Sequence, residues 1–233
     1  MLGQSVTSAL IFIFLLKKML DITGKIKLRF KRLFFPTLKS SIWIFLLTLV
    51  PILFQNSSAF LLGSFVSPFQ LGLYFGAAKI HLSFNALYGP IGQAVYPRLV
   101  LSNEISRYES KKLTVKFFWF MLSLGLLFFA IIFLFSNKII MILLGSEFIE
   151  ASNTLKLFGL VLPLTAVSHV LGRQWLIIQK NDKIFSIITL FSFLFTVIFL
   201  ILTIEFLGIN AIPISLIIFE LITIFIILIR ISK

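Results

Sequence analysis

Basic residues occupy every second gap between the long apolar runs of this 233-residue chain. Seventeen of the 21 Lys and Arg residues fall in four patches, which lie within residues 17–39, 98–116, 180–183 and 230–233. The gaps between these patches, at residues 65–70, 136–156 and 205–208, contribute only Lys138 and Lys156. This alternation is the positive-inside pattern of a multi-spanning membrane protein, whose basic loops stay in the cytoplasm. We therefore expect the chain to cross a bilayer several times and to end in the cytoplasm.

The composition also favours a membrane protein over a soluble one. Hydrophobic residues make up 59% of the chain and charged residues 12%, whereas a soluble domain has about 45–50% and about 25%. The net charge of +13 lies mainly in loops beside the apolar runs, where anionic lipid headgroups attract basic residues. We expect membrane lipids and no nucleic acid as partners, because nucleic-acid binding needs a basic face on a soluble scaffold.

Seven apolar segments can be recognised along the chain. They are residues 2–16, 41–64, 71–97, 113–135, 157–179, 184–204 and 209–229. Six of them reach the ~20 residues that cross ~30 Å of hydrocarbon, but the first has only 15 residues. We predict an all-α polytopic membrane protein with about seven transmembrane helices. Residues 1–40 would hold the end of a preceding transmembrane helix and a basic cytoplasmic loop, and residues 41–233 a six-helix bundle. The short first segment also suggests that the chain is a fragment of a longer protein.

Two connecting segments are long enough to form structure of their own. Residues 17–39 alternate basic and apolar side chains, which fits either an amphipathic helix at the membrane interface or a solvated loop. Residues 136–156 begin with the apolar run Ile139–Leu144, which is too short to cross the bilayer, and turn at Gly145. We expect this second segment to form a hook at the outer interface.

Polar residues interrupt three of the predicted spans, and the last span carries one acidic residue. The candidates that we consider are Gln55, Asn56, Lys79, His81, Asn85, His169, Arg173 and Glu220. Polar groups at membrane depth are costly, so they tend to face a protein interior or a water-filled cavity. Pro51, Pro90 and Pro163 lie in the same three spans, and proline kinks a transmembrane helix. We expect Pro90 to break the span at residues 71–97 and Pro97 to close it.

Three short motifs follow one another along the chain. Residues 72–80 read GLYFGAAKI, with PI at 90–91 and AVYPRL at 94–99. Residues 144–155 place Gly145, Phe148 and Ala151 after Leu144, and residues 207–211 read LGINA. In order, these motifs resemble the eighth helix, the periplasmic hook and the turn into the last helix of O-antigen flippases. Those flippases belong to the multidrug/oligosaccharidyl-lipid/polysaccharide exporter superfamily. The third motif departs from the family pattern, since Asn210 replaces a Gly and Pro213 a small residue.

The resemblance implies a transporter of about twelve helices, built as two six-helix bundles around a cavity that opens alternately to each side. Residues 41–233 would be the C-terminal bundle and residues 2–16 the end of the sixth helix. The implied substrate is an undecaprenyl-diphosphate-linked O-antigen oligosaccharide, which is flipped across the bacterial inner membrane during lipopolysaccharide biosynthesis. The implied protein partners are the missing N-terminal half of the same protein, the O-antigen polymerase and the chain-length machinery.

A diphosphate that crosses hydrocarbon needs cationic partners, and a charge pair at ~4 Å contributes ~4 kcal/mol at an effective dielectric constant of ~20. Lys79 lies eight residues into its segment and is the first candidate to bind the phosphate. Alternatively, it reaches the outer headgroups or pairs with Glu220. Arg173 follows Thr165 and His169 at intervals of four residues, so the three form one polar stripe. Because Arg173 lies only six residues from the inner end of its segment, contact with cytoplasmic headgroups is the stronger interpretation for it.

Four other candidates suit either substrate binding or helix packing. His81 and Asn85 lie four residues apart on one helix face, and they would bind either sugar hydroxyls or a neighbouring helix. Gln55 and Asn56 follow Pro51, and they would either line the cavity or pack helices together.

Glu220 is the carboxylic residue nearest to the middle of a span, 11 residues from the start of its segment. A protonatable acid at this depth would couple flipping to a proton gradient, with His169 at similar depth as its partner. The alternative interpretation is a buried carboxyl that stays neutral and has no role in transport.

Enzymatic motifs are missing from the sequence. It has no Gly-rich phosphate loop, no His/Glu metal cluster and no nucleophile elbow, so we expect no enzyme, no cofactor and no metal site. The sequence favours a flippase of lipid-linked oligosaccharides that acts by alternating access. A drug or cation antiporter of the same superfamily is the alternative, although it needs acidic cavity residues and only Glu220 qualifies. An inner-membrane polysaccharide polymerase is the third interpretation.

Overall fold

The computed structural model describes residues 30–232, and their side chains except at residues 30–40, 44, 55, 58 and 232. The chain forms two units, Met1–Ile42 and Trp43–Lys233. In the first unit, residues 30–42 are helical, so the predicted basic loop at 17–39 ends in the first turns of a long helix. The predicted segment 2–16 and the rest of that loop lie outside the described residues.

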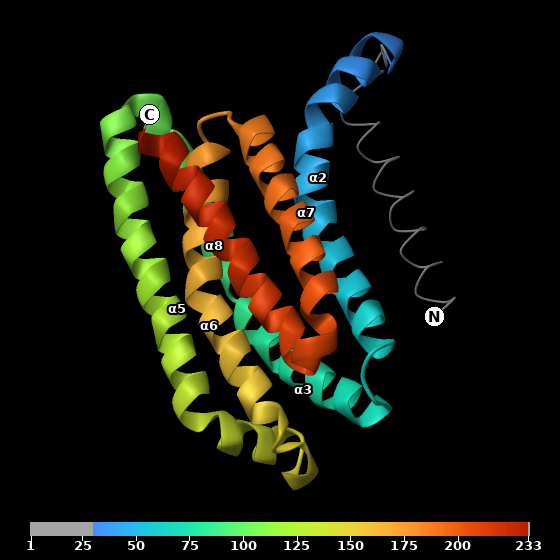
Figure 1. The fold of residues 1–233 in the computed structure, drawn as a ribbon. Coiled ribbons are helices and arrows are strands. Elements are labelled where there is room, and N and C mark those ends of the chain that lie inside the picture. Colours follow the sequence, from blue (N-terminus) through green and yellow to red (C-terminus); the bar gives the residue numbers. More distant parts are fainter. Residues whose placement is uncertain (1–29, 233) are drawn as a thin grey trace, which may run out of the picture. The chain divides into compact units, whose positions relative to one another are not determined.

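Helices make up the described part of the chain, and residues 30–232 contain no strand. The elements are α2 (Phe30–Gly63), α3 (Pro68–Asn85), α4 (Tyr88–Ile105), α5 (Arg107–Leu143), η1 (Ser146–Phe148), α6 (Ala151–His169), η2 (Val170–Leu176), α7 (Asp182–Leu207), η3 (Gly208–Asn210) and α8 (Ala211–Ser232). In the unit Trp43–Lys233 the long helices run side by side in alternating directions (Figure 1). The helix α6 packs against α3, α5 and α8.

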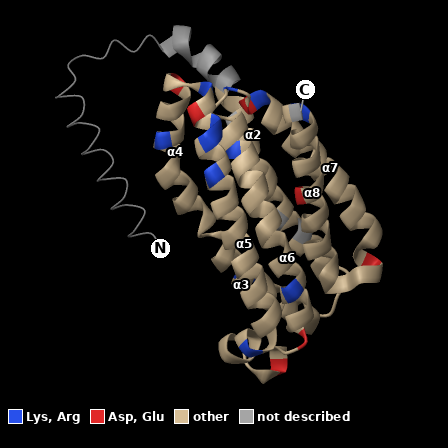
Figure 2. Ribbon diagram, turned by 90° about the vertical axis from the view of Figure 1, so that its left-hand side faces the viewer, with Lys and Arg blue, Asp and Glu red and all other residues tan. Residues whose placement is uncertain are grey.

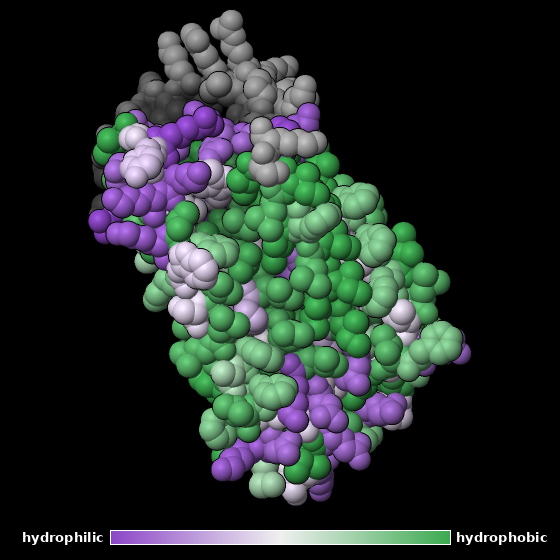
Figure 3. Space-filling view, turned by 60° about the vertical axis from the view of Figure 1, so that its left-hand side comes forward, coloured by the Kyte–Doolittle hydropathy of each residue, from purple (hydrophilic) through white to green (hydrophobic). Residues whose placement is uncertain are grey.

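Four helical stretches among the described residues are long and apolar enough to cross a membrane: Ser41–Gly63, Arg107–Leu143, Ala151–Leu176 and Asp182–Ile231. Large apolar side chains cover the outside of the unit, and Phe60, Ile142 and Phe206 are 79%, 80% and 84% exposed. Figure 3 shows a broad hydrophobic band between two polar ends. Lipid tails can solvate such a band, whereas water cannot. The predicted fold class, an all-α polytopic membrane protein, is confirmed.

Charged residues gather at the two ends of the unit Trp43–Lys233, and one end is much more basic than the other (Figure 2). The basic end carries the patches around residues 98–116 and 180–183 together with Arg230, while the opposite end carries Lys138 and Lys156. Because successive helices run in alternating directions, every second loop lies at the same end of the bundle (Figure 1). The alternation of charge along the sequence therefore makes one end more basic than the other. The orientation of this bundle in a membrane remains a prediction from the positive-inside rule.

The predicted span at residues 71–97 is divided into two helices, α3 and α4, by a break at Ala86 and Leu87. The expected cause is Pro90, because proline has no N–H group to donate to the carbonyl of Ala86 and its ring clashes with that carbonyl. The expectation that Pro97 closes the helix is wrong, since α4 continues through Pro97. The helix ends at Ile105, and the backbone of the next residue, Ser106, is extended. The hydroxyl oxygen of Ser106 caps α5 by accepting a hydrogen bond from the N–H of Tyr108 at 3.2 Å.

The predicted hook at residues 136–156 is shorter than expected. The apolar run Ile139–Leu144 continues α5 up to Leu143, so it extends a helix that already spans the bundle. The turn then takes place at Gly145, whose φ of 102° favours glycine. A single 3₁₀ turn, η1, leads from there into α6.

The helices α5 and α6 approach each other closely at Gly125. A Cβ atom added there would lie 2.7 Å from Cα of Pro163 and 3.2 Å from Cβ of Ala166. We expect Gly125→Ala to lower the free energy of unfolding by about 1–3 kcal/mol, because the clash is with backbone that cannot rotate away. The measurement is thermal or denaturant unfolding of the purified protein in detergent, followed by circular dichroism.

The matched control for this prediction is Gly89→Ala. Gly89 also lies in a helix, but its added Cβ would meet no atom within 4 Å. We expect the control to be neutral or slightly stabilising, since alanine suits a helix better than glycine. Equal stability of the two variants would contradict the close packing of α5 on α6.

Candidate functional site

A cavity of about 420 Å³ lies within the unit Trp43–Lys233, between α2, α3, α6, α7 and α8. Its wall is mostly apolar and aromatic, with Phe54, Tyr74, Phe158, Phe185, Phe193 and Phe219 among the lining residues. Its polar lining residues are His81, Asn85, Thr165, Ser168, His169, Arg173, Thr189, Glu220 and Thr223. An apolar cavity with a few convergent polar groups is the usual form of a ligand site in a protein.

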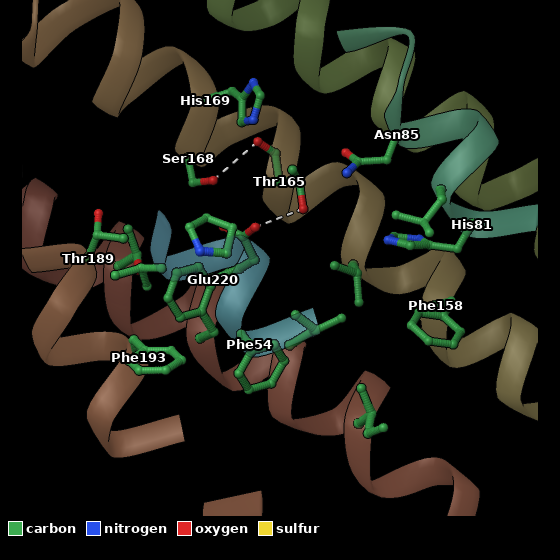
Figure 4. A pocket seen from close by; sticks show the side chains of 18 of the residues that line it. Phe54, His81, Asn85, Phe158, Thr165, Ser168, His169, Thr189, Phe193 and Glu220 are labelled. Carbon is green, nitrogen blue, oxygen red and sulfur yellow. Dashed lines mark hydrogen bonds between the residues drawn. The ribbon is translucent and has the colours of Figure 1, made fainter. Parts of the chain in front are cut away.

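The helix α6 and its continuation η2 supply one polar wall of the cavity (Figure 4). Ser168, His169 and Arg173 follow Thr165 by three, four and eight residues, so the four side chains lie on one side of the helix. From Val170 to Leu176 the backbone is a π-helix, in which the N–H of Ile177 donates to the carbonyl of Gly172 at 3.2 Å. Such segments are rare and recur at functional sites. Here the π-helix carries Arg173 into the lining of the cavity.

Glycines allow the π-helix to sit close to its neighbours. A Cβ atom on Gly172 would overlap the ring of Phe185 on α7. On the other side, a Cβ atom on Gly92 of α4 would lie 2.7 Å from the amide nitrogen of Gln174. These approaches hold η2 against α7 and α4, so the position of Arg173 depends on the packing of three elements.

Glu220 reaches the cavity from α8 and is only 7% exposed. The hydroxyl group of Thr165 donates a hydrogen bond of 2.8 Å to Oε1 of Glu220, while Oε2 has no hydrogen-bond partner. Ser168 donates in turn to the backbone carbonyl of Thr165 at 3.2 Å. The hydroxyl of Thr223, one turn beyond Glu220, also has no partner. The carboxyl group therefore has one oxygen free for a further hydrogen bond, and Thr223 offers a free hydroxyl in the lining of the same cavity.

The helix α3 supplies the facing polar groups, and its side chains point into the same space as Thr165 and Glu220 (Figure 4). The ring of His81 stacks on Phe158 with centroids 4.9 Å apart, and its Nδ1 atom has no partner. The side-chain oxygen of Asn85 is also without a partner. A buried polar atom without a partner costs about 1–3 kcal/mol, which favours a polar ligand or water between these groups.

Five of the residues proposed from the sequence meet in this cavity: His81, Asn85, His169, Arg173 and Glu220. Arg173 thus lines the cavity, although its distance from the end of the span favoured the membrane surface. Thr189 and Thr223 also line the cavity and were not proposed from the sequence. The spacing of Thr223, three residues after Glu220, was the available signal.

The structure does not bring Lys79 to the cavity. Lys79 is exposed, while the cavity side of α3 carries Ala78, His81, Leu82 and Asn85. Each residue turns a helix by about 100°, so Lys79 lies to the side of this face even though its depth is suitable.

Of the two candidates on α2, Asn56 is not brought into this site. Asn56 is exposed and its amide donates to the carbonyl of Ile52, one turn earlier, at 2.9 Å. The side chain of Gln55 lies outside the described part of the structure.

The arrangement can bind a ligand that carries both charge and hydroxyl groups. Arg173 offers a guanidinium, which forms bidentate hydrogen bonds with phosphate. Glu220 and Asn85 can accept hydrogen bonds, and His81, His169 and Thr165 can both donate and accept them. In the described part of the chain no three His, Cys, Asp or Glu side chains are grouped to hold a metal ion.

Residues 1–100 match a family model described as "Polysaccharide biosynthesis protein". The matched stretch includes α2, α3 and the first part of α4, and with them the motif at residues 72–80. It ends before α6 and α8, which carry most of the polar cavity wall. Comparisons with curated proteins and with solved structures found no match. The chain is therefore similar to polysaccharide biosynthesis proteins over less than half of its length.

The hydrogen bond from Thr165 to Glu220 links α6 to α8 across the cavity wall. We expect Thr165→Val to lower the free energy of unfolding by about 1–3 kcal/mol, because it leaves Oε1 of the buried carboxyl without a donor. The control is Thr189→Val in the same cavity, where the hydroxyl donates only to the carbonyl of Phe185 on its own helix. Denaturant unfolding of both variants in detergent tests the difference. If both lose the same stability, the link between α6 and α8 does not contribute.

Proposed function

We propose that the chain is part of a transporter that flips lipid-linked polysaccharide precursors across the bacterial inner membrane. The proposed substrate is an undecaprenyl-diphosphate-linked oligosaccharide, such as an O-antigen unit, which moves from the cytoplasmic to the periplasmic leaflet. The similarity of residues 1–100 to polysaccharide biosynthesis proteins supports the pathway. The observation that carries the proposal is Arg173 among the few polar groups of a largely apolar cavity inside a membrane-spanning bundle.

The diphosphate is the part of this substrate that hydrocarbon rejects most strongly. A guanidinium in a site shielded from water forms strong, charge-assisted hydrogen bonds to phosphate oxygens. Inserting an Arg at the middle of a membrane helix costs ~2.5–3.5 kcal/mol, and a phosphate at ~4 Å returns ~4 kcal/mol at an effective dielectric constant of ~20. One phosphate therefore offsets the cost of Arg173.

The sugars need hydrogen-bonding groups next to apolar surface. Asn85, His81 and His169 supply donors and acceptors, and the rings of Phe158 and Phe193 supply flat apolar walls. The polyprenyl tail needs no pocket, because it stays in the membrane. A cavity of about 420 Å³ takes the diphosphate and the first sugar rather than a whole oligosaccharide. The rest of the glycan would occupy space shared with the other half of the transporter.

Alternating access requires helices that bend, and two elements beside the cavity have irregular backbones. The break between α3 and α4 lies next to Asn85 and Gly89, and the π-helix η2 carries Arg173. Helices interrupted at membrane depth commonly border transport sites. A change at either point would move a polar group relative to the cavity without unfolding the bundle.

A drug or cation antiporter is the second candidate function. The buried carboxyl group of Glu220 favours it, because a cationic substrate needs an acidic partner. Arg173 in the same cavity opposes it, since a guanidinium repels the same substrate. Sensitivity of cells to cationic drugs separates the two functions: a flippase leaves it unchanged, whereas an antiporter decreases it.

Arg173 and Lys79 form a matched pair for a test of the proposed function. We expect Arg173→Gln to weaken substrate binding about 10–100-fold, because a hydrogen bond between charged groups contributes about 1.5–3 kcal/mol. Lys79→Gln removes the same charge from outside the cavity and should change binding by less than about twofold. Weaker substrate binding should reduce transport. The measurement is therefore the amount of polysaccharide on the surface of cells that carry each variant at equal protein level.

Two further observations decide the outcome. Loss of display with Arg173→Gln should coincide with lipid-linked single units that remain on the cytoplasmic side. Accumulation of those units on the outer side would instead indicate a polymerase. Normal display with Arg173→Gln would remove the cavity from the transport mechanism.

A further inference from the structure

Two ionisable side chains of opposite sign share the cavity. Arg173 enters from η2 and Glu220 from α8, and they are the Arg, Lys, Asp and Glu residues among the described residues that line it. The carboxyl group is nearly enclosed, with 7% of the side chain exposed. An ionised carboxylate at such a place needs a nearby positive charge, because its transfer out of water is very costly.

One of the two carboxyl oxygens of Glu220 is free to carry a proton. Thr165 donates to Oε1, so this oxygen is an acceptor in either charge state. Oε2 has no partner and is therefore the atom that would carry a proton. Arg173 is the basic side chain among the described residues that line the cavity, so it is the positive group available to the ionised form.

We propose that Glu220 takes up one proton when an anionic group binds at Arg173, so that this site couples anion binding to proton uptake. The inference rests on the proposed function, because it takes the diphosphate as the anion. An arriving phosphate competes with the Glu220 carboxylate for the guanidinium and repels the carboxylate. Protonation of Oε2 from water removes both effects. The proton comes from a hydronium ion or a buffer acid in the surrounding water: its bond to that donor breaks, and an O–H bond forms on Glu220.

Other titratable groups also face Glu220, and the test has to separate them. They are His169 on α6 and Tyr74 and His81 on α3, while α2, α4 and α7 contribute no titratable side chain to the described lining. A histidine that gains a proton as the anion binds would produce the same direction of pH dependence. Variants of both histidines are therefore part of the experiment.

The linkage has a definite sign. Below the pH at which Glu220 ionises, the site is ready for the anion and its affinity does not change with pH. Above that pH, each anion must bring a proton, so the dissociation constant rises by up to about tenfold per pH unit. By reciprocity, anion binding increases the affinity of Glu220 for the proton by the same factor.

The experiment measures binding of farnesyl diphosphate, a short prenyl diphosphate, to the full chain in lipid nanodiscs between about pH 5.5 and 8.5. The protein is compared with Glu220→Gln, which keeps the acceptor for Thr165 but cannot ionise. The dissociation constant of the unmodified protein is divided by that of Glu220→Gln at each pH, so that the titration of the ligand itself cancels. We expect this ratio to rise with pH, by up to about tenfold per pH unit over part of the range.

The histidine variants and a proton count complete the design. His169→Gln and His81→Gln, each with and without Glu220→Gln, should show the same rise of the ratio with pH, even where they bind more weakly. Calorimetry in buffers of different ionisation heat should find about one more proton taken up by the protein than by Glu220→Gln above the ionisation pH.

The possible results distinguish the inference from the proposed function. A ratio that is constant with pH, or a rise that disappears with a histidine variant, overturns the proton linkage but leaves diphosphate binding intact. No binding of farnesyl diphosphate at any pH overturns the proposed function and the linkage with it. If Glu220→Gln fails to fold, the infrared carbonyl band of a protonated carboxyl decides: it must grow when the ligand is added to the unmodified protein, and an unchanged band overturns the linkage.

Discussion

Polar groups inside hydrocarbon need hydrogen-bond partners within the protein. The helix α6 provides such partners at two depths in the bundle. Together with η2 it is the most buried of the four membrane-spanning stretches in the described residues. Near one end, Thr154 donates to the side-chain oxygen of Asn210 on η3 at 2.7 Å. Deeper in, Thr165 donates to Glu220 on α8. These two bonds tie η3 and the C-terminal helix α8 to α6, and the cavity lies beside the second of them.

Irregular backbone borders the cavity on two sides. Non-ideal helix is tolerated at membrane depth only where protein or a watery cavity surrounds it. The break before Pro90 leaves Asn85 at the end of α3, and Arg173 lies in the π-helix η2 that follows α6. Each irregularity therefore costs backbone hydrogen bonds in a place where a ligand or water can replace them. The two interrupted helices and the polar side chains therefore border the same cavity.

The sequence predicted which residues lie deep in the membrane, but less well which of them share a site. His81, Asn85, His169, Arg173 and Glu220 meet as candidates around one cavity, because polar residues at depth avoid lipid. Lys79 has the right depth and the wrong direction, since depth follows from counting residues while direction depends on the rotation of the helix. The pairing of Thr165 with Glu220, 55 residues apart, could not be read from either segment alone.

The sequence by itself determined the membrane class, the helical secondary structure and the basic character of one end of the bundle. Each of these depends on local quantities: the length of an apolar run and the charge of the loop that follows it. The tertiary structure alone decided which faces of α3, α6 and α8 enclose the cavity and that an arginine and a carboxyl group share it. Those relations depend on how neighbouring helices are rotated and interrupted, and the sequence of a single helix does not specify the partner against which it packs.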